Sequence, residues 1–122
     1  MVQRGDRLIY CGGALADLYA AMDGAVQMAG KPFAPIYRLA LIEAEALLGR
    51  PLDHARILCI GDGVATDVRG ANDQDLDCLF IARGIQGDAA MGADGRLDPG
   101  LTEALLAREG VRAMAAMADL VW

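Results

Sequence analysis

Short apolar runs alternate along the chain with segments in which apolar residues recur every three or four positions. The short apolar runs are typical of strands buried on both faces, and the recurrence every three or four positions is typical of amphipathic helices. The predicted strands are 25–29, 57–60 and 78–82, and 8–11 is either a brief strand or an extended lead-in. The predicted helices are 14–22, 35–48, 66–73, 100–108 and an alanine-rich terminal helix at 111–121. This alternation predicts right-handed βαβ units and a parallel sheet, hence the α/β class.

Glycines and prolines mark several boundaries of these elements. Pro35 suits the first turn of a helix, where its missing N–H costs nothing, and Gly49 followed by Pro51 predicts where that helix ends. Residues 86–98 contain several glycines and predict a surface loop. No stretch has the composition of a linker between two domains, so residues 1–122 are predicted to form a single domain.

The strand 57–60 leads into the most informative stretch, Gly61-Asp62-Gly63-Val64-Ala65-Thr66-Asp67. The glycines allow a sharp turn, Thr66 suits a helix N-cap, and Asp67 then falls in the first turn of the helix. Two carboxylates are thereby predicted at the carboxyl end of a parallel strand, where open α/β sheets build their sites. Asp62 is interpreted either as a turn residue that caps the helix or as a ligand of a hard cation such as Mg²⁺.

Lys31 lies in Gly30-Lys31-Pro32, between a predicted strand and a predicted helix. It is either a solvated loop residue or a fixed ammonium that neutralises phosphate. Asp73, Asp75 and Asp77 alternate as in a calcium loop, but Cys78 stands where that loop requires glycine. The three aspartates are therefore predicted to lie in a solvated turn, and His54 is predicted to lie at the surface.

Composition excludes several classes of function. The net charge of −6 argues against non-specific binding of nucleic acid, and no apolar stretch reaches the length of a membrane span. Three cysteines without a CxxC pair, two of them in apolar runs, predict reduced thiols and a cytoplasmic location. One histidine cannot complete a His/Cys zinc site.

Taken together, these motifs resemble the C-terminal half of the catalytic core of the haloacid dehalogenase superfamily, in its class with a large C2-type cap. The resemblance rests on Gly30-Lys31-Pro32, on a helix that carries Ile36-Tyr37, on Ile57 to Asp67, on Cys78 to Gly84, and on Cys11-Gly12-Gly13-Ala14-Leu15. It implies a partial Rossmann-like, three-layer sandwich with a short parallel sheet.

The resemblance also implies a phosphatase that acts on a small phosphorylated metabolite through Mg²⁺ and an aspartyl-phosphate. Lys31 corresponds to the lysine that steadies the nucleophile and the substrate phosphate. Asp62 corresponds to the acid that binds Mg²⁺, and Asp67 to the second acid, which supports both the metal and the lysine.

Two parts of the family pattern have no match here. Residues 1–30 contain no apolar strand ending in Asp-x-Asp, the motif that supplies the nucleophile, and neither the second-motif Ser or Thr nor the cap is found. The chain is therefore expected to be a truncated product, a fragmentary gene model or half of a split protein. One hypothesis is a phosphatase half-core, which self-associates or pairs with a missing N-terminal half. The other is an inactive remnant, and the order of Lys31 before Asp62 argues against a phospho-receiver domain.

Overall fold

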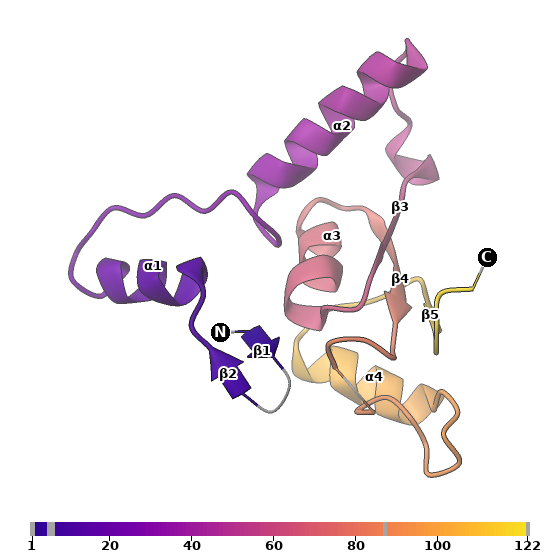
Figure 1. Cartoon of the computed structure of the whole chain (residues 1–122). Helices are drawn as coiled ribbons and strands as arrows, with labels where there is room; N and C mark the ends of the chain where they lie inside the picture. Colours follow the sequence, from indigo (N-terminus) through magenta and orange to yellow (C-terminus); the bar gives the residue numbers. More distant parts are fainter. Residues whose placement is uncertain (1, 5–6, 87, 122) are drawn as a thin grey trace.

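Three parallel strands form the sheet around which the C-terminal two thirds of the chain fold (Figure 1). A computed structural model describes residues 2–4, 7–86 and 88–121. The sheet has the order β3 (Leu58–Gly61), β4 (Asp77–Ile81) and β5 (Ala115–Met117). Cys59 lies opposite Cys78, and Leu79 lies opposite Ala115. The predicted α/β class, with a short parallel sheet of the Rossmann type, is confirmed.

The hydrophobic core surrounds β4, the central strand. Its side chains at Cys78 and Phe80 are at most 1% exposed, because successive residues of a strand face opposite sides and these two share the covered side. The helices that reach this core are α3 (Arg69–Asp73) and α4 (Pro99–Arg108). The core cluster consists of Val64, Val68, Ala71, Leu76, Cys78, Phe80, Ala82, Ala90, Met91, Leu105 and Leu106.

Local sequence accounts for the ends of two predicted helices. In α4, Pro99 occupies the first turn and the Asp98 carboxylate accepts a hydrogen bond from Leu101 N at 2.8 Å. In α2 (Ala34–Leu48), Pro35 occupies the first turn, and Gly49 ends the helix with a φ of 64°, a value that favours glycine. Both helices are therefore confirmed close to their predicted bounds.

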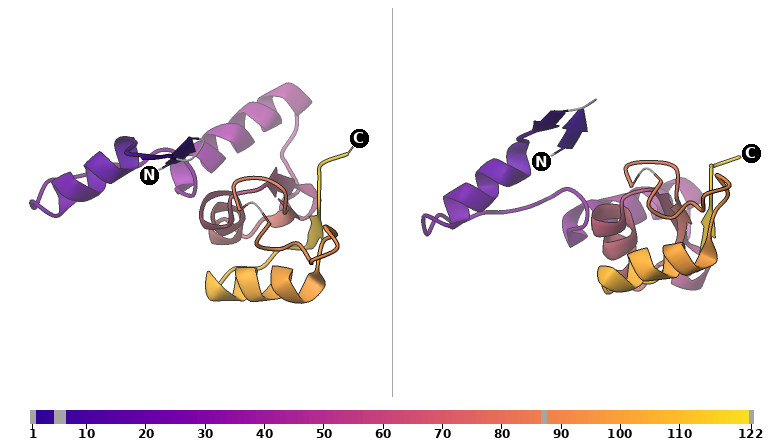
Figure 2. Two further views of the ribbon diagram at one scale, coloured as in Figure 1. Left: turned by 60° about the horizontal axis from the view of Figure 1, so that its bottom comes forward. Right: turned by 90° about the horizontal axis from the view of Figure 1, so that it is seen from below.

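The N-terminal third lies beside this sheet rather than in it (Figures 1 and 2). An antiparallel hairpin of β1 (Val2–Arg4) and β2 (Arg7–Ile9) leads into α1 (Gly12–Ala20), so the predicted lead-in and helix are confirmed. The predicted strand 25–29 is wrong, since this stretch has no regular structure and makes no strand pairing. Neither α1 nor α2 has a buried residue.

The predicted terminal helix over 111–121 is also wrong. Gly110 adopts a φ of 64°, which ends α4 and redirects the chain, and the next residues pair with β4 as strand β5. Met114 N donates to Cys78 O, and Met117 O accepts from Ala82 N, both at 2.9 Å. Alanine favours helices, but helix propensity is a weak prior, and the open edge of β4 supplies partners for these backbone groups.

The predicted loop 86–98 is irregular but not wholly at the surface, and its Gly87 lies outside the described residues. Ala90 is fully buried, and Met91 pairs with Leu97 through a single antiparallel bridge. The Arg83 guanidinium fastens the loop by donating to Gly95 O at 2.5 Å. Within the described ranges, no helix is long and apolar enough to cross a bilayer.

Candidate functional site

The turn after β3 places Asp67 beside the end of the strand. A π-helical turn (Val64–Val68) begins directly after Gly63 and continues into α3, so the helix starts two residues earlier than predicted. Thr66 is therefore inside the helical turn, and its predicted role as N-cap is wrong. The Asp67 carboxylate instead accepts a hydrogen bond from Gly63 N at 2.9 Å, from within the helix.

Glycine is required at position 61 by this close packing. A Cβ on Gly61 would lie 2.7 Å from Asp67 Oδ2, which is closer than real Cβ contacts come. The last residue of the strand therefore has no side chain because the Asp67 carboxylate occupies that space. This explains physically why Gly61 and Asp67 occur together.

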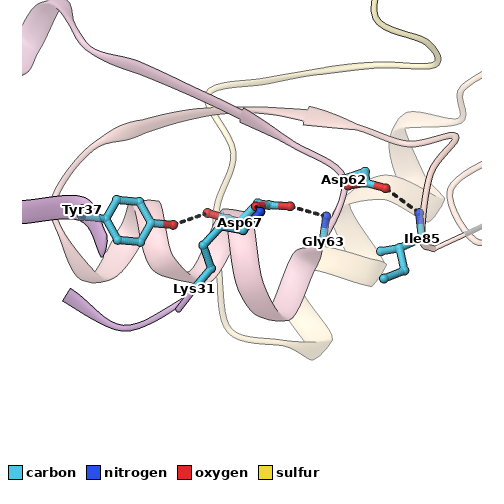
Figure 3. Close-up of polar contacts among 6 residues, drawn as sticks. All are labelled: Lys31, Tyr37, Asp62, Gly63, Asp67 and Ile85. Atoms are coloured by element: carbon cyan, nitrogen blue, oxygen red, sulfur yellow. Dashed lines mark hydrogen bonds and ion pairs between the residues drawn. The ribbon is translucent and has the colours of Figure 1, made fainter. Parts of the chain in front are cut away.

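Lys31 reaches Asp67 from a distant part of the chain (Figure 3). Its Nζ lies 2.5 Å from Asp67 Oδ1, across 36 residues of sequence. The Lys31 side chain is 55% exposed whereas that of Asp67 is 11% exposed. The ammonium therefore faces solvent, and the carboxylate holds it from the protein side. The Lys31–Pro32 peptide bond is cis. Lys31 is also the only lysine in the chain.

Asp62 is held by the loop that follows β4. Its Oδ2 accepts a hydrogen bond from Ile85 N at 2.7 Å (Figure 3). A Cβ on Gly84 would lie 2.6 Å from Asp62 Cγ, so glycine at this position leaves room for the carboxylate. Asp62 and this loop thus meet where two parallel strands end, at the carboxyl edge of the sheet.

Tyr37 also contacts Asp67. The family resemblance included this residue but implied no role for it. Its hydroxyl lies 3.5 Å from Asp67 O, and its half-buried ring packs against the core. Burial raises the pKa of Tyr37 to about 12, with further contributions from Cys59 and Asp67. The hydroxyl therefore keeps its proton at neutral pH.

The other candidate residues lie away from this edge. His54 is exposed in a 3-10 turn (His54–Arg56) before β3, at the opposite end of the strand from Asp62. Asp73 is the last residue of α3, Asp75 lies in the turn that follows, and Asp77 is the first residue of β4. In the part of the chain that the structure describes, no three His, Cys, Asp or Glu residues form a group that could hold a metal ion.

The cysteines are free, as predicted. Cys59 on β3 lies opposite Cys78 on β4 in the register of the sheet. Burial raises the pKa of the Cys59 thiol and raises that of Cys78 to about 11, with a further contribution from Asp67 in each case. Both thiols are thus protonated and poorly nucleophilic at neutral pH.

A cavity of about 270 Å³ opens between α2 and β3, next to the ion pair. Apolar side chains from both elements line it, together with Lys31, Tyr37 and Asp67. The Lys31–Asp67 ion pair therefore adjoins an apolar hollow, while the Asp62 carboxylate, at the same edge of the sheet, is turned toward Ile85.

The profile of the HAD-hydrolase-like family matches residues 28–107, which include Lys31, Asp62 and Asp67. The chain belongs to the haloacid dehalogenase-like hydrolases. No curated protein sequence matches it significantly.

Solved structures agree with this membership. A haloacid dehalogenase-like hydrolase from Brucella suis 1330 is 43% identical, with a TM-score of 0.72 over 99% of this chain. The p-nitrophenyl phosphatase from Archaeoglobus fulgidus has a TM-score of 0.55 over 88% of this chain, and at 19% identity it shows the fold alone. The chain spans 41% of the length of the first protein and 35% of the second.

Proposed function

We propose that this chain provides the lysine-and-metal half of a phosphohydrolase site, for a small phosphate ester. The observation that carries the proposal is the ion pair of Lys31 and Asp67 beside Asp62, at the carboxyl edge of the sheet. Phosphoryl transfer depends on positioning and on neutralising the negative charge of the transferred group. An exposed ammonium on a buried carboxylate suits that task, because the carboxylate fixes its place while its donors stay open to an anion.

The donor set fits Mg²⁺ in part. This ion prefers oxygen ligands and often binds through one or two carboxylates, with water and substrate phosphate completing its shell. Asp62 accepts one hydrogen bond, at Oδ2, so it is the better placed ligand. Asp67 accepts a hydrogen bond on each oxygen, yet a carboxylate oxygen has a second lone pair for a metal. Bound Mg²⁺ would supply charge neutralisation at the phosphate.

The covalent step requires a nucleophilic aspartate, and the Asp-x-Asp motif that supplies it in the family has no match in residues 1–30. That group would attack phosphorus, the bond to the leaving oxygen would break, and water would then hydrolyse the aspartyl-phosphate. We propose that another polypeptide segment supplies it, from an N-terminal half-core that pairs with this chain. In the alternative, the chain is an inactive remnant that folds without a catalytic role.

Binding of inorganic phosphate with Mg²⁺, measured by calorimetry, tests the proposal. Lys31→Met is expected to weaken phosphate binding at least about tenfold, because it removes a charge-assisted hydrogen bond. Asp62→Asn is expected to remove the Mg²⁺ dependence of that binding. Arg38→Met and Asp17→Asn change exposed charges elsewhere and serve as matched controls.

The two hypotheses differ in what this measurement shows. Equal affinity in Lys31→Met, Asp62→Asn and the controls would contradict the half-site. Hydrolysis of p-nitrophenyl phosphate by the chain alone is expected to be absent. Activity that Asp62→Asn abolishes would refute both the remnant and the need for another segment. A reading frame upstream of Met1 that encodes a strand ending in Asp-x-Asp would favour the half-core over the remnant.

A further inference from the structure

Tyr37 and Lys31 belong to the same segment, and both contact Asp67 (Figure 3). The Lys31 ammonium binds the carboxylate, and the Tyr37 hydroxyl faces the main-chain carbonyl of the same residue. Among the described residues, these are the side-chain hydrogen bonds that tie residues 24–48 to the sheet and its helices, since Glu45 bonds only to Leu52 N in the following loop. The placement of Lys31 therefore depends on few contacts.

Gly70 provides the space that the Tyr37 ring occupies. Gly70 is buried on α3, three residues after Asp67. A Cβ there would overlap the Tyr37 hydroxyl and would lie 2.7 Å from Tyr37 Cζ. The ring thus lies directly against the backbone of α3, a distance of approach that only glycine permits.

We infer that Tyr37 is a positioning residue for Lys31, and that the absence of a side chain at Gly70 creates the space in which the Tyr37 ring is held. The ring fixes the start of α2 against α3. This contact determines how far the backbone at Lys31 lies from the Asp67 carboxylate. The contact of the Tyr37 hydroxyl with Asp67 O, at 3.5 Å, is at the long limit of a hydrogen bond. The packing of the ring against Gly70 is therefore the main determinant of the position of Lys31. The inference rests on the proposed function only in that the positioned ammonium is the one that meets phosphate.

The single lysine makes a direct test possible. Protein labelled with ¹³C-lysine gives one ε-methylene signal by nuclear magnetic resonance, and Asp67→Asn defines its position when the ion pair is lost. Tyr37→Leu and Gly70→Ala are expected to shift the signal at least halfway to that position. Tyr37→Phe keeps the ring and is expected to cause only a small shift. Tyr10→Leu, at an exposed tyrosine, and Gly12→Ala, with nothing within 4 Å, are the controls.

A wild-type signal in folded Tyr37→Leu would overturn the inference, and so would an equal shift in the controls. If Gly70→Ala does not fold, the comparison of Tyr37→Leu with Tyr37→Phe decides, since a role limited to core packing would leave the Lys31 signal in place. Inorganic phosphate with Mg²⁺ is then added to the wild-type protein. A Lys31 signal that does not respond contradicts the proposed function, whereas the effect of Tyr37 on that signal is measured without any ligand.

Discussion

Asp67 holds the candidate site together at the scale of single residues. Its carboxylate accepts from Lys31 on one oxygen and from Gly63 on the other, and its carbonyl faces Tyr37. The sequence predicted Asp67 as one of two acids beside the strand. Its contact with Lys31 was implied only by the family resemblance, because 36 residues separate the two positions.

Asp67→Asn is expected to destabilise the fold by about 1–2 kcal/mol, because a neutral amide weakens both charge-assisted hydrogen bonds at a nearly buried position. The exposure of Lys31 to solvent limits the contribution of the ion pair to stability, so the expected loss is small. Urea denaturation measures this change in the free energy of unfolding. Asp62→Asn, which alters one hydrogen bond to a partly exposed carboxylate, is the matched control and should cost less. The reverse order would show that Asp67 is not the central residue.

At the scale of elements, the largest difference between prediction and structure is β5. Its alanines and methionines have the composition of a helix, but Ala115–Met117 lie along the second edge of β4. The π-helical turn at 64–68 is a smaller difference, since Gly63 rather than Thr66 precedes the turn and its N–H donates to the Asp67 side chain. For β5 the deciding hydrogen-bonding partner comes from another element, β4, whereas in the π-helical turn it is a side chain of the turn itself.

Met114→Pro tests the pairing of β5. Met114 N donates to Cys78 O at 2.9 Å while its side chain is 71% exposed, so the backbone donor is the important group. Proline removes that donor and is expected to cost about 1–3 kcal/mol of stability. Met114→Ala keeps the N–H and should change thermal unfolding little. Equal unfolding temperatures for the two variants would contradict the strand.

At the scale of the whole molecule, a large apolar surface remains open. In the described residues β3 pairs only with β4, so its other edge presents unpaired backbone groups. Leu58 and Ile60 on β3 are 48% and 42% exposed. Large hydrophobic side chains exposed on α1 and α2 are Leu15, Leu18, Tyr19, Ile36, Leu39, Ile42, Leu47 and Leu48. Open strand edges and exposed apolar side chains favour association between chains.

The chain by itself is therefore expected to self-associate at micromolar concentration. Sedimentation velocity over a dilution series measures this, and higher salt should increase association by screening the net charge of −6. Ile60→Lys places a charge beside the open edge and is expected to shift the distribution toward monomer. Leu101→Lys, at a residue 44% exposed on α4, is the matched control. A stable monomer at all concentrations would contradict the prediction.

The sequence by itself determined the strands at 57–60 and 78–82, the helices α2 and α4, and the two acids after β3. These features depend on local periodicity, on Pro and Gly at element ends, and on apolar runs, all of which can be read within about ten residues. Only the tertiary structure decided β5, the position of Tyr37 against Gly70, and the meeting of Lys31 with Asp67. Each of these depends on a partner far away in the chain, and a local pattern carries no information about which distant backbone group or side chain will be within reach.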